Sequence, residues 1–212
     1  MLVERYAVPI GVASAELVIK NSRFIGTVGR AHDATAAREF VAHVRQMHPD
    51  ASHNAWAYRL HEGPQGDFAF SDDGEPGGTA GRPMLAVLEG SGLCEVAAVG
   101  TRYFGGIKLG TGGLVRAYSA CVREALARVS RLDMVLHHTV RITVDYSAYG
   151  PLSYQLPRLG VKLEETDFAE RVTFTLAAPE HALAQVATVV QEETGGKTII
   201  SSWSGYRYDP AN

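Results

Sequence analysis

Cysteine is scarce in this chain: Cys94 and Cys121 are the only two among 212 residues. Both fall on faces that the sequence pattern predicts to be buried, so they are more simply interpreted as reduced core residues than as a disulfide framework. Long apolar runs are missing as well, because none approaches the ~20 residues needed to span a bilayer. The first residues lack the basic and apolar regions of a secretory signal. These absences predict a cytoplasmic protein with no membrane partner.

Common catalytic and metal-binding motifs are also absent from the sequence. The eight histidines show no HExxH spacing, and the two cysteines form no CxxC pair. The chain contains no G-x-S-x-G nucleophile elbow, no Walker A motif and no proper GxGxxG fingerprint. We therefore predict no catalytic residues, no metal and no cofactor, and we favour a non-catalytic role over an enzymatic one.

The formal net charge is −3, which argues against a generic electrostatic binder of nucleic acid. The charge is unevenly distributed, however. Residues 76–128 carry six Lys and Arg against three Asp and Glu, whereas residues 1–75 and 129–212 each carry seven against ten. A solvated helix face also produces such a local excess. The excess suits a compact acidic ligand or a local contact with RNA, and we expect no binding to a DNA duplex.

A glycine-rich segment, residues 102–116, lies between a predicted strand and a predicted helix. Residues 93–101 are apolar and β-branched, which favours a buried strand. The apolar residues that recur at helical spacing after the glycines are Leu114, Tyr118, Cys121, Ala125 and Val129. Five glycines in the nine positions 105–113 let the backbone adopt left-handed conformations and let another molecule approach closely.

The same segment suits an anion. Unpaired N–H groups at the N-terminus of the following helix favour negative charge, and Arg102, Lys108 and Arg116 add three cations. Arg116 falls in the first turn, where a cation opposes the helix dipole unless an anion or a carboxylate compensates it. Tyr103 and Phe104 end the strand and either stack on a base or join the core, and we expect one inward and one outward. The segment predicts a surface that receives phosphate or another acidic group.

Three carboxylates, Asp72, Asp73 and Glu75, lie in a loop rich in glycine and proline, residues 71–81. Clustered carboxylates can hold Mg²⁺ or accept hydrogen bonds from nearby basic groups. Alternatively, the two aspartates organise the turn through bonds from side chain to backbone. We favour this second interpretation for each carboxylate alone. As a group facing residues 102–116, they are candidate components of a site.

The pattern predicts an α+β protein of two domains, residues 1–133 and 134–212. The first part has predicted strands at 15–20, 22–30, 53–60 and 66–70, with a turn at 63–66. It also has a helix over 35–47, for which Thr35 is the expected N-cap, and a short helix beginning near Pro83. From about residue 136 the expected order is βαββαβ, a ferredoxin-like arrangement. Its elements are 137–146, 148–159, 161–166, 171–177, 179–194 and 198–208. Pro157 is expected to end the first of these helices early.

Three blocks of the sequence resemble the IMPACT/YigZ family. They are HNAWAYR at 53–59, SDDGEPGGTAGRP at 71–83 and TRYFGGIKLGTGGLVRAY at 101–118. Together they span most of the first domain, and the second and third are long and specific. The chain departs from the family at Ala55, where relatives often have Cys, and this argues against a functional thiol there.

The resemblance implies an N-terminal α/β domain similar to the second domain of a small-subunit ribosomal protein. That fold is shared with part of elongation factor G and with galactokinase-like kinases. The resemblance also implies a C-terminal ferredoxin-like domain similar to the last domain of elongation factor G. Eukaryotic relatives regulate translation by competing for an activator of the amino-acid-starvation kinase. They carry an additional N-terminal protein-binding domain, for which this chain has no room.

Three functional hypotheses remain at this point. The leading one is a non-catalytic regulator of translation or of its stress response that binds RNA, the ribosome or a ribosome-associated protein. The second is an enzyme for a small phosphorylated or carboxylated substrate, held between residues 71–81 and 102–116. The third is an interaction module that uses the C-terminal sheet. The candidate phosphate-, nucleic-acid- or partner-binding residues are Asp72, Asp73, Glu75, Thr79, Arg82, Arg102, Tyr103, Gly105, Gly106, Lys108, Gly110, Gly112, Gly113 and Arg116.

Overall fold

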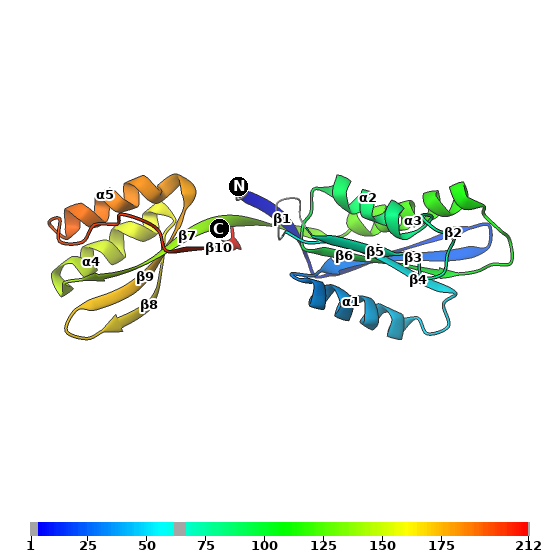
Figure 1. Cartoon of the computed structure of the whole chain (residues 1–212), viewed down its shortest axis with the longest axis horizontal. Helices are drawn as coiled ribbons and strands as arrows, with labels where there is room; N and C mark the ends of the chain where they lie inside the picture. The colour runs from blue at the N-terminus through cyan, green and yellow to red at the C-terminus, as the bar shows by residue number, and fades with distance from the viewer. Residues whose placement is uncertain (1–3, 62–66, 212) are drawn as a thin grey trace. The chain divides into compact units, whose positions relative to one another are not determined.

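The structure is a computed structural model that describes residues 4–61 and 67–211. It forms two compact units, residues 6–133 and residues 134–211 with residues 4–5 (Figure 1). The chain is an α+β protein with two antiparallel sheets and five α-helices in its described part, as predicted. Among the described residues, no helix combines the length and the apolar character needed to cross a bilayer.

The N-terminal unit is built on an antiparallel sheet with the strand order β2-β3-β6-β4-β5. Its strands are β2 (Val12–Ile19), β3 (Ser22–Arg30), β4 (His53–Arg59), β5 (Phe68–Ser71) and β6 (Val96–Tyr103). Its helices are α1 (Ala34–Met47), α2 (Gly81–Ser91) and α3 (Thr111–Leu126). Helices α2 and α3 cover one face of the sheet and α1 covers the other (Figure 1). Strand β6, buried along nearly all its length, is therefore the centre of the unit.

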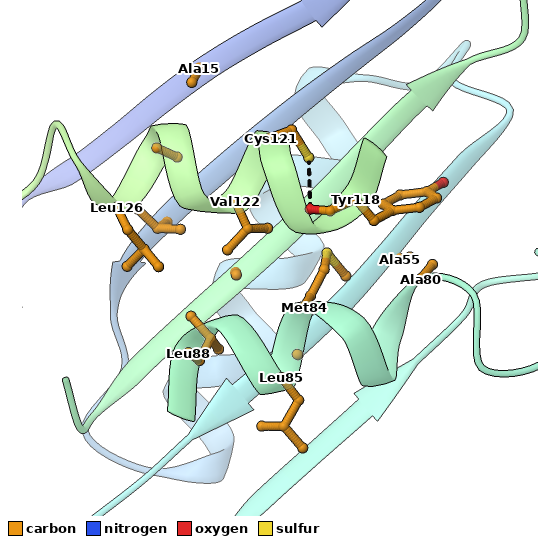
Figure 2. Packing of buried hydrophobic residues seen from close by; sticks show 14 of the residues in the cluster. Ala15, Ala55, Ala80, Met84, Leu85, Leu88, Tyr118, Cys121, Val122 and Leu126 are labelled. Carbon is orange, nitrogen blue, oxygen red and sulfur yellow. Dashed lines mark hydrogen bonds between the residues drawn. The ribbon is translucent and has the colours of Figure 1, made fainter. Parts of the chain in front are cut away.

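Helices α2 and α3 lie side by side and run in the same direction. Figure 2 shows Met84 near Tyr118 at one end, and Leu88 near Leu126 at the other. The helices approach the sheet closely where it carries glycine. A Cβ built on Gly26 would lie 2.2 Å from a backbone oxygen of α3, so only glycine fits there.

Both cysteines are free and buried, as the sequence predicted. The Cys121 thiol donates a hydrogen bond to the Tyr118 carbonyl oxygen at 3.3 Å, drawn as the dashed line in Figure 2. Burial raises the pKa of this thiol to about 12, so it stays protonated at neutral pH.

The start of α1 differs from the sequence prediction. Asp33, and not Thr35, is the N-cap: its carboxylate accepts a hydrogen bond from the N–H of Ala36 at 2.7 Å. The aspartate occupies the extended cap position, whereas Thr35 lies inside the first turn. Strand β6 begins at Val96, three residues later than the predicted start at residue 93, and ends at Tyr103. The predicted turn at 63–66 lies outside the described residues.

The C-terminal unit has the ferredoxin-like strand order. Its elements are β7 (Ser130–Val144), α4 (Tyr146–Gln155), the 3₁₀ helix η1 (Leu156–Leu159), β8 (Lys162–Phe168), β9 (Val172–Pro179), the 3₁₀ helix η2 (Glu180–Ala182), α5 (Leu183–Glu193) and β10 (Gly205–Pro210). The sheet order is β10-β7-β9-β8, and β1 (Arg5–Ile10) also pairs with β7. In the order of the four predicted strands this is 4-1-3-2, which fits the predicted βαββαβ arrangement.

Two C-terminal boundaries differ from the predictions. Strand β7 begins at Ser130, so a continuous strand occupies the segment where the domain boundary was expected. The last strand begins at Gly205 and not at residue 198, because Thr198 is held outside the ladder. Its N–H donates to the Thr194 hydroxyl at 3.1 Å, and its own hydroxyl donates to the Thr143 carbonyl oxygen at 3.0 Å.

Replacing Gly26 with Ala is expected to destabilise the N-terminal unit by about 1–3 kcal/mol, because α3 must shift to admit the methyl group. Trp56 lies in this unit and Trp203 in the other, so unfolding in urea can be followed by Trp56 fluorescence in a Trp203→Phe background.

The matched control is Gly90→Ala. Gly90 lies inside α2 with nothing within 4 Å of an added Cβ. The gain in helix propensity there should stabilise the unit by up to about 1 kcal/mol. Equal effects of the two substitutions would contradict the close approach of α3.

Candidate functional site

Four loops meet at the end of the N-terminal sheet where β6 stops. They are the turn at 20–21, the segment 48–52, the loop 72–80 and the glycine-rich loop 104–110. Two hydrogen bonds help to join them: the Phe104 N–H donates to the Ser52 hydroxyl oxygen at 3.0 Å, and the Gly105 N–H donates to the Ser22 hydroxyl oxygen at 3.1 Å. The glycine-rich loop is thereby fixed against two other segments of the chain.

Beneath these loops lies a buried polar cluster formed by Glu75, Arg102 and Tyr118. Arg102 Nη1 donates to both carboxylate oxygens of Glu75, at 2.8 and 3.1 Å. The Tyr118 hydroxyl donates to Glu75 Oε1 at 2.8 Å. Burial, followed by the neighbouring Glu75 carboxylate, raises the pKa of Tyr118 far above its usual value, so the phenol stays a donor.

This cluster takes two of the predicted site residues out of contact with solvent. Glu75 and Arg102 are only 8% and 5% exposed. The Arg102 guanidinium lies 5.4 Å from the ring centroid of Phe24 and 5.2 Å from that of Phe104, which adds cation–π attraction. Arg102 therefore stabilises the interior of the domain. The cations of this segment that remain exposed are Lys108 and Arg116.

Asp72 organises the loop and the start of α2. Its carboxylate accepts hydrogen bonds from the N–H groups of Gly78, Ala80 and Gly81 at 2.8–2.9 Å. Partial burial opposes ionisation of Asp72, but these three N–H groups outweigh it and hold the pKa below its usual value. The carboxylate thus satisfies N–H groups at the N-terminus of α2 from a distant position in the chain.

Asp73 is likewise committed to contacts within the domain. Its carboxylate accepts from the Asn54 N–H at 2.6 Å and from Arg45 Nη2 at 2.5 Å, while His53 Nδ1 lies 2.8 Å from its carbonyl oxygen. The Thr79 hydroxyl donates to the Pro76 carbonyl oxygen at 2.7 Å. In the described part of the chain, no group of three or more His, Cys, Asp or Glu side chains could hold a metal ion. The contacts of Asp72 fit the turn-organising interpretation, whereas the Asp73 carboxylate ties the loop to β4 and α1.

The glycine-rich loop is tight on one side and open on the other. A Cβ on Gly105 would lie 2.1 Å from the backbone of Asn21, so this position faces inward. Gly106 and Gly110 have φ values of +83° and +73°, in the left-handed region that favours glycine. A Cβ on either would meet nothing within 4 Å, so both positions border open space.

The N-terminus of α3 has no carboxylate to balance it. Its N-cap is Gly110, and its first turn contains no acidic residue. Within the described residues, the N–H groups of residues 111–113 have no acceptor in the protein. Gly112 and Gly113 add no side chain that could serve as one.

Two exposed cations adjoin this helix end. A Cβ on Gly112 would lie 3.6 Å from Arg116 Nη1, so the Arg116 guanidinium lies over the same first turn. Neither Arg116 nor Lys108 forms an ion pair with any described residue. The positive helix end and the two unpaired cations repel one another, and a bound anion would offset this repulsion.

Two aromatic side chains flank the loop. One of the two was expected inward and one outward, and Phe104, which is 49% exposed, is the outward one. Tyr103 is half-buried: its hydroxyl lies 2.9 Å from His48 Nδ1, and the Arg23 guanidinium lies 4.3 Å from its ring centroid. Sequence reasoning missed Arg23, although its place directly after the tight turn at 20–21 is a signal. Nothing in the sequence indicates that His48 meets Tyr103.

The predicted site residues therefore fall into three groups. Those at the open surface, called here the loop surface, are Tyr103, Gly106, Lys108, Gly110, Gly112, Gly113 and Arg116. Those that hold the loops together are Asp72, Asp73, Glu75, Thr79, Arg102 and Gly105. Arg82 belongs to neither group, because it lies on α2, with Nη1 3.9 Å from Glu89 Oε1.

The chain combines a two-domain α+β fold with a glycine-rich loop at the end of its first sheet, and models of known protein families match both of its domains. The model of the Impact N-terminal domain matches residues 20–126, and a domain of unknown function, DUF1949, matches residues 142–197. The chain belongs to the IMPACT family.

Its relatives include bacterial proteins of similar length. The IMPACT family member YvyE of Bacillus subtilis (strain 168) is 38% identical over 185 residues, which cover 87% of this chain and 85% of the relative. The family member YigZ of Escherichia coli (strain K12) is 36% identical over 195 residues, 91% and 95% of the two chains. A crystal structure of a hypothetical protein, 34% identical, covers 98% of this chain and 97% of its own with a TM-score of 0.68.

Replacing Tyr118 with Phe is expected to lower the unfolding free energy of the N-terminal unit by about 1–3 kcal/mol, because buried Glu75 loses a donor. Urea unfolding followed by Trp56 fluorescence measures the change. Tyr206→Phe is the control, since Tyr206 is 58% exposed in the other unit. A loss no larger than that of the control would rule out a stabilising role for this hydroxyl.

Asp72→Ala is expected to cost about 0.5–2 kcal/mol of unfolding free energy at neutral pH, because N–H groups at the start of α2 lose their acceptor. The folded-state pKa of Asp72 is lowered, so its contribution is complete above the unfolded pKa of ~3.9 and is lost as the pH falls through the folded value. The difference from wild type should therefore shrink below about pH 4.

The control for this pH series is Asp50→Ala, an exposed carboxylate in the segment 48–52. A destabilisation by Asp72→Ala that stayed constant from neutral pH to well below ~3.9 would contradict the role of the ionised carboxylate.

Proposed function

We propose that this chain is a non-catalytic regulator of translation that binds single-stranded RNA, on or off the ribosome, through the loop surface. The observation that carries the proposal is the unbalanced positive end of α3. Its free N–H groups lie beside the Arg116 guanidinium, the exposed Lys108 precedes the N-cap by two residues, and no described carboxylate pairs with either cation. A phosphate group supplies the missing negative charge and accepts hydrogen bonds from the backbone N–H groups.

The form of the surface supports a nucleic acid over a free phosphate. Phe104 is exposed beside the glycines, so a base can stack on its face while the adjoining phosphate lies at the helix end. Arg23, held over the Tyr103 ring and with Nε 3.9 Å from Glu16 Oε2, adds a further exposed cation. One exposed aromatic face and three cations suit a short stretch of single strand.

The net charge of −3 sets the expected strength of this interaction. The proposal assigns three cations, Arg23, Lys108 and Arg116, to RNA contact, so binding should involve about three phosphates and be strong only at low salt. A local contact of this kind suits RNA that is presented by a larger assembly such as the ribosome. The enzyme hypothesis gains nothing from the geometry, because Asp72, Asp73 and Glu75 are all held in contacts within the domain.

Fluorescence anisotropy with a labelled single-stranded RNA, measured over a salt series, tests this function. Wild-type log K should fall with log salt at a slope of about −2, as expected for three phosphate contacts. In the double variant Lys108→Gln/Arg116→Gln the slope should become shallower by about 1.4. Phe104→Ala should weaken binding by about 1–3 kcal/mol without changing the slope.

Arg38→Gln is the matched control, since Arg38 is an exposed cation on α1, on the opposite face of the sheet. Co-sedimentation with ribosomes at low salt should show the same ranking of variants. Undetectable RNA binding at low salt, or a slope that the double variant leaves unchanged, would refute the proposed function.

A further inference from the structure

A groove of about 760 Å³ is lined by residues of α2 and α3, several of which are exposed to solvent. Side chains along its walls are small: Ala86 and Gly90 on α2 and Ser119 on α3 leave the space open. The two helices run in the same direction (Figure 2), and lining residues are spread along both, so the groove is called here the trough. Its volume is within the range of specific binding sites.

The floor of the trough is apolar. Val87 and Val115 line it from the two helices and are half-buried, whereas Leu126, also in its lining, belongs to the buried core. Apolar side chains that remain partly accessible at the bottom of a concave surface gain free energy when another apolar group covers them.

The charge of the trough has one sign. Arg82, Arg123 and Arg131 line it, and no Asp or Glu is among its lining residues. Arg82 has only the long contact of 3.9 Å to Glu89, and neither Arg123 nor Arg131 forms an ion pair with a described residue. The three arginines, distributed over α2, α3 and the start of β7, therefore line an apolar strip, and two of them, Arg123 and Arg131, have no ion-pair partner among the described residues.

We infer that this trough is a docking site for an acidic amphipathic helix of a partner protein. The apolar floor requires a row of aliphatic side chains, and the three arginines require carboxylates beside that row. A helix with Leu at positions i, i+3, i+4 and i+7, flanked by Glu, supplies both. Helix α2 is 11 residues long, about 16 Å, so the trough accommodates about three turns.

The chemistry distinguishes this occupant from a nucleic acid. No aromatic side chain lines the trough, so bases have no stacking partner there, and a phosphate backbone gains nothing from an aliphatic floor. The inference goes beyond the proposed function, because it involves a protein partner and a surface other than the loop surface. The two can fail independently.

The probe is a fluorescein-labelled synthetic peptide of about 14 residues that places Leu on one face and Glu beside it. Fluorescence anisotropy during titration with the full chain should show saturable binding that weakens at high salt. Arg123→Glu should reduce the affinity by at least about tenfold, because it adds repulsion where attraction is lost. Arg38→Glu, on α1, is the control and should leave the affinity within about twofold.

Two further peptides define the outcome. A scrambled peptide of the same composition should bind at least about tenfold more weakly, since its leucines no longer share a face. The peptide with Lys in place of Glu should not bind. Amide shifts in ¹H–¹⁵N spectra should concentrate at Ala86, Gly90, Ser119 and Ala127, which line the trough.

Equal binding of the scrambled peptide, or shifts confined to residues outside the trough, would overturn the inference. So would an Arg123→Glu variant that lost single-stranded RNA and kept the peptide, because the trough would then be a nucleic-acid surface. The proposed function is tested by substitutions at Lys108 and Arg116, and the trough by a substitution at Arg123. The outcome of one experiment therefore does not determine the outcome of the other.

Discussion

The buried contact of Glu75 with Arg102 and Tyr118 is the constraint on which the rest of the N-terminal domain depends. It joins the loop before α2, the central strand β6 and helix α3, three segments that are far apart in sequence. Burying a charged pair is costly unless its remaining hydrogen-bonding groups are satisfied, and removing one partner leaves an uncompensated charge. The tyrosine hydroxyl and the aromatic rings around the guanidinium offset part of that cost, although the buried Arg102 Nε has no hydrogen-bond partner among the described residues. The pair fixes where the loops can lie.

The burial of Arg102 determines which charges remain for binding. One of the three cations in the glycine-rich segment is neutralised internally, and the three carboxylates of the loop 72–80 are used to shape it. What is left at the loop surface is a small positive region formed by backbone amides and two side chains. The positive charge of the loop surface therefore comes both from its two cationic side chains and from the N-terminal end of α3, where the helix dipole is positive.

Most of the fold could be predicted from the sequence, because it follows from local patterns. The apolar run before the glycines and the helical spacing after them predict β6 and α3, and the alternation of strands and helices after residue 136 predicts the ferredoxin-like unit. The contacts of the site could not be predicted as well from the sequence. The sequence shows Arg102 and Glu75 as two charged residues 27 positions apart, and only the antiparallel pairing of β6 with β3 and β4 buries the arginine. The distant cap from Asp72 and the meeting of His48 with Tyr103 likewise depend on tertiary contacts.

The central position of β6 has a consequence for synthesis of the chain. Strands β2 and β3 form one hairpin and β4 and β5 another, and β6 pairs with both through β3 and β4. Until residues 96–103 leave the ribosome, each hairpin exposes an unpaired inner edge of the kind that promotes association between nascent chains. Folding of the whole sheet therefore waits for a strand made near the end of the domain. A chain terminated before this strand would carry two hairpins with unpaired inner edges and would tend to aggregate.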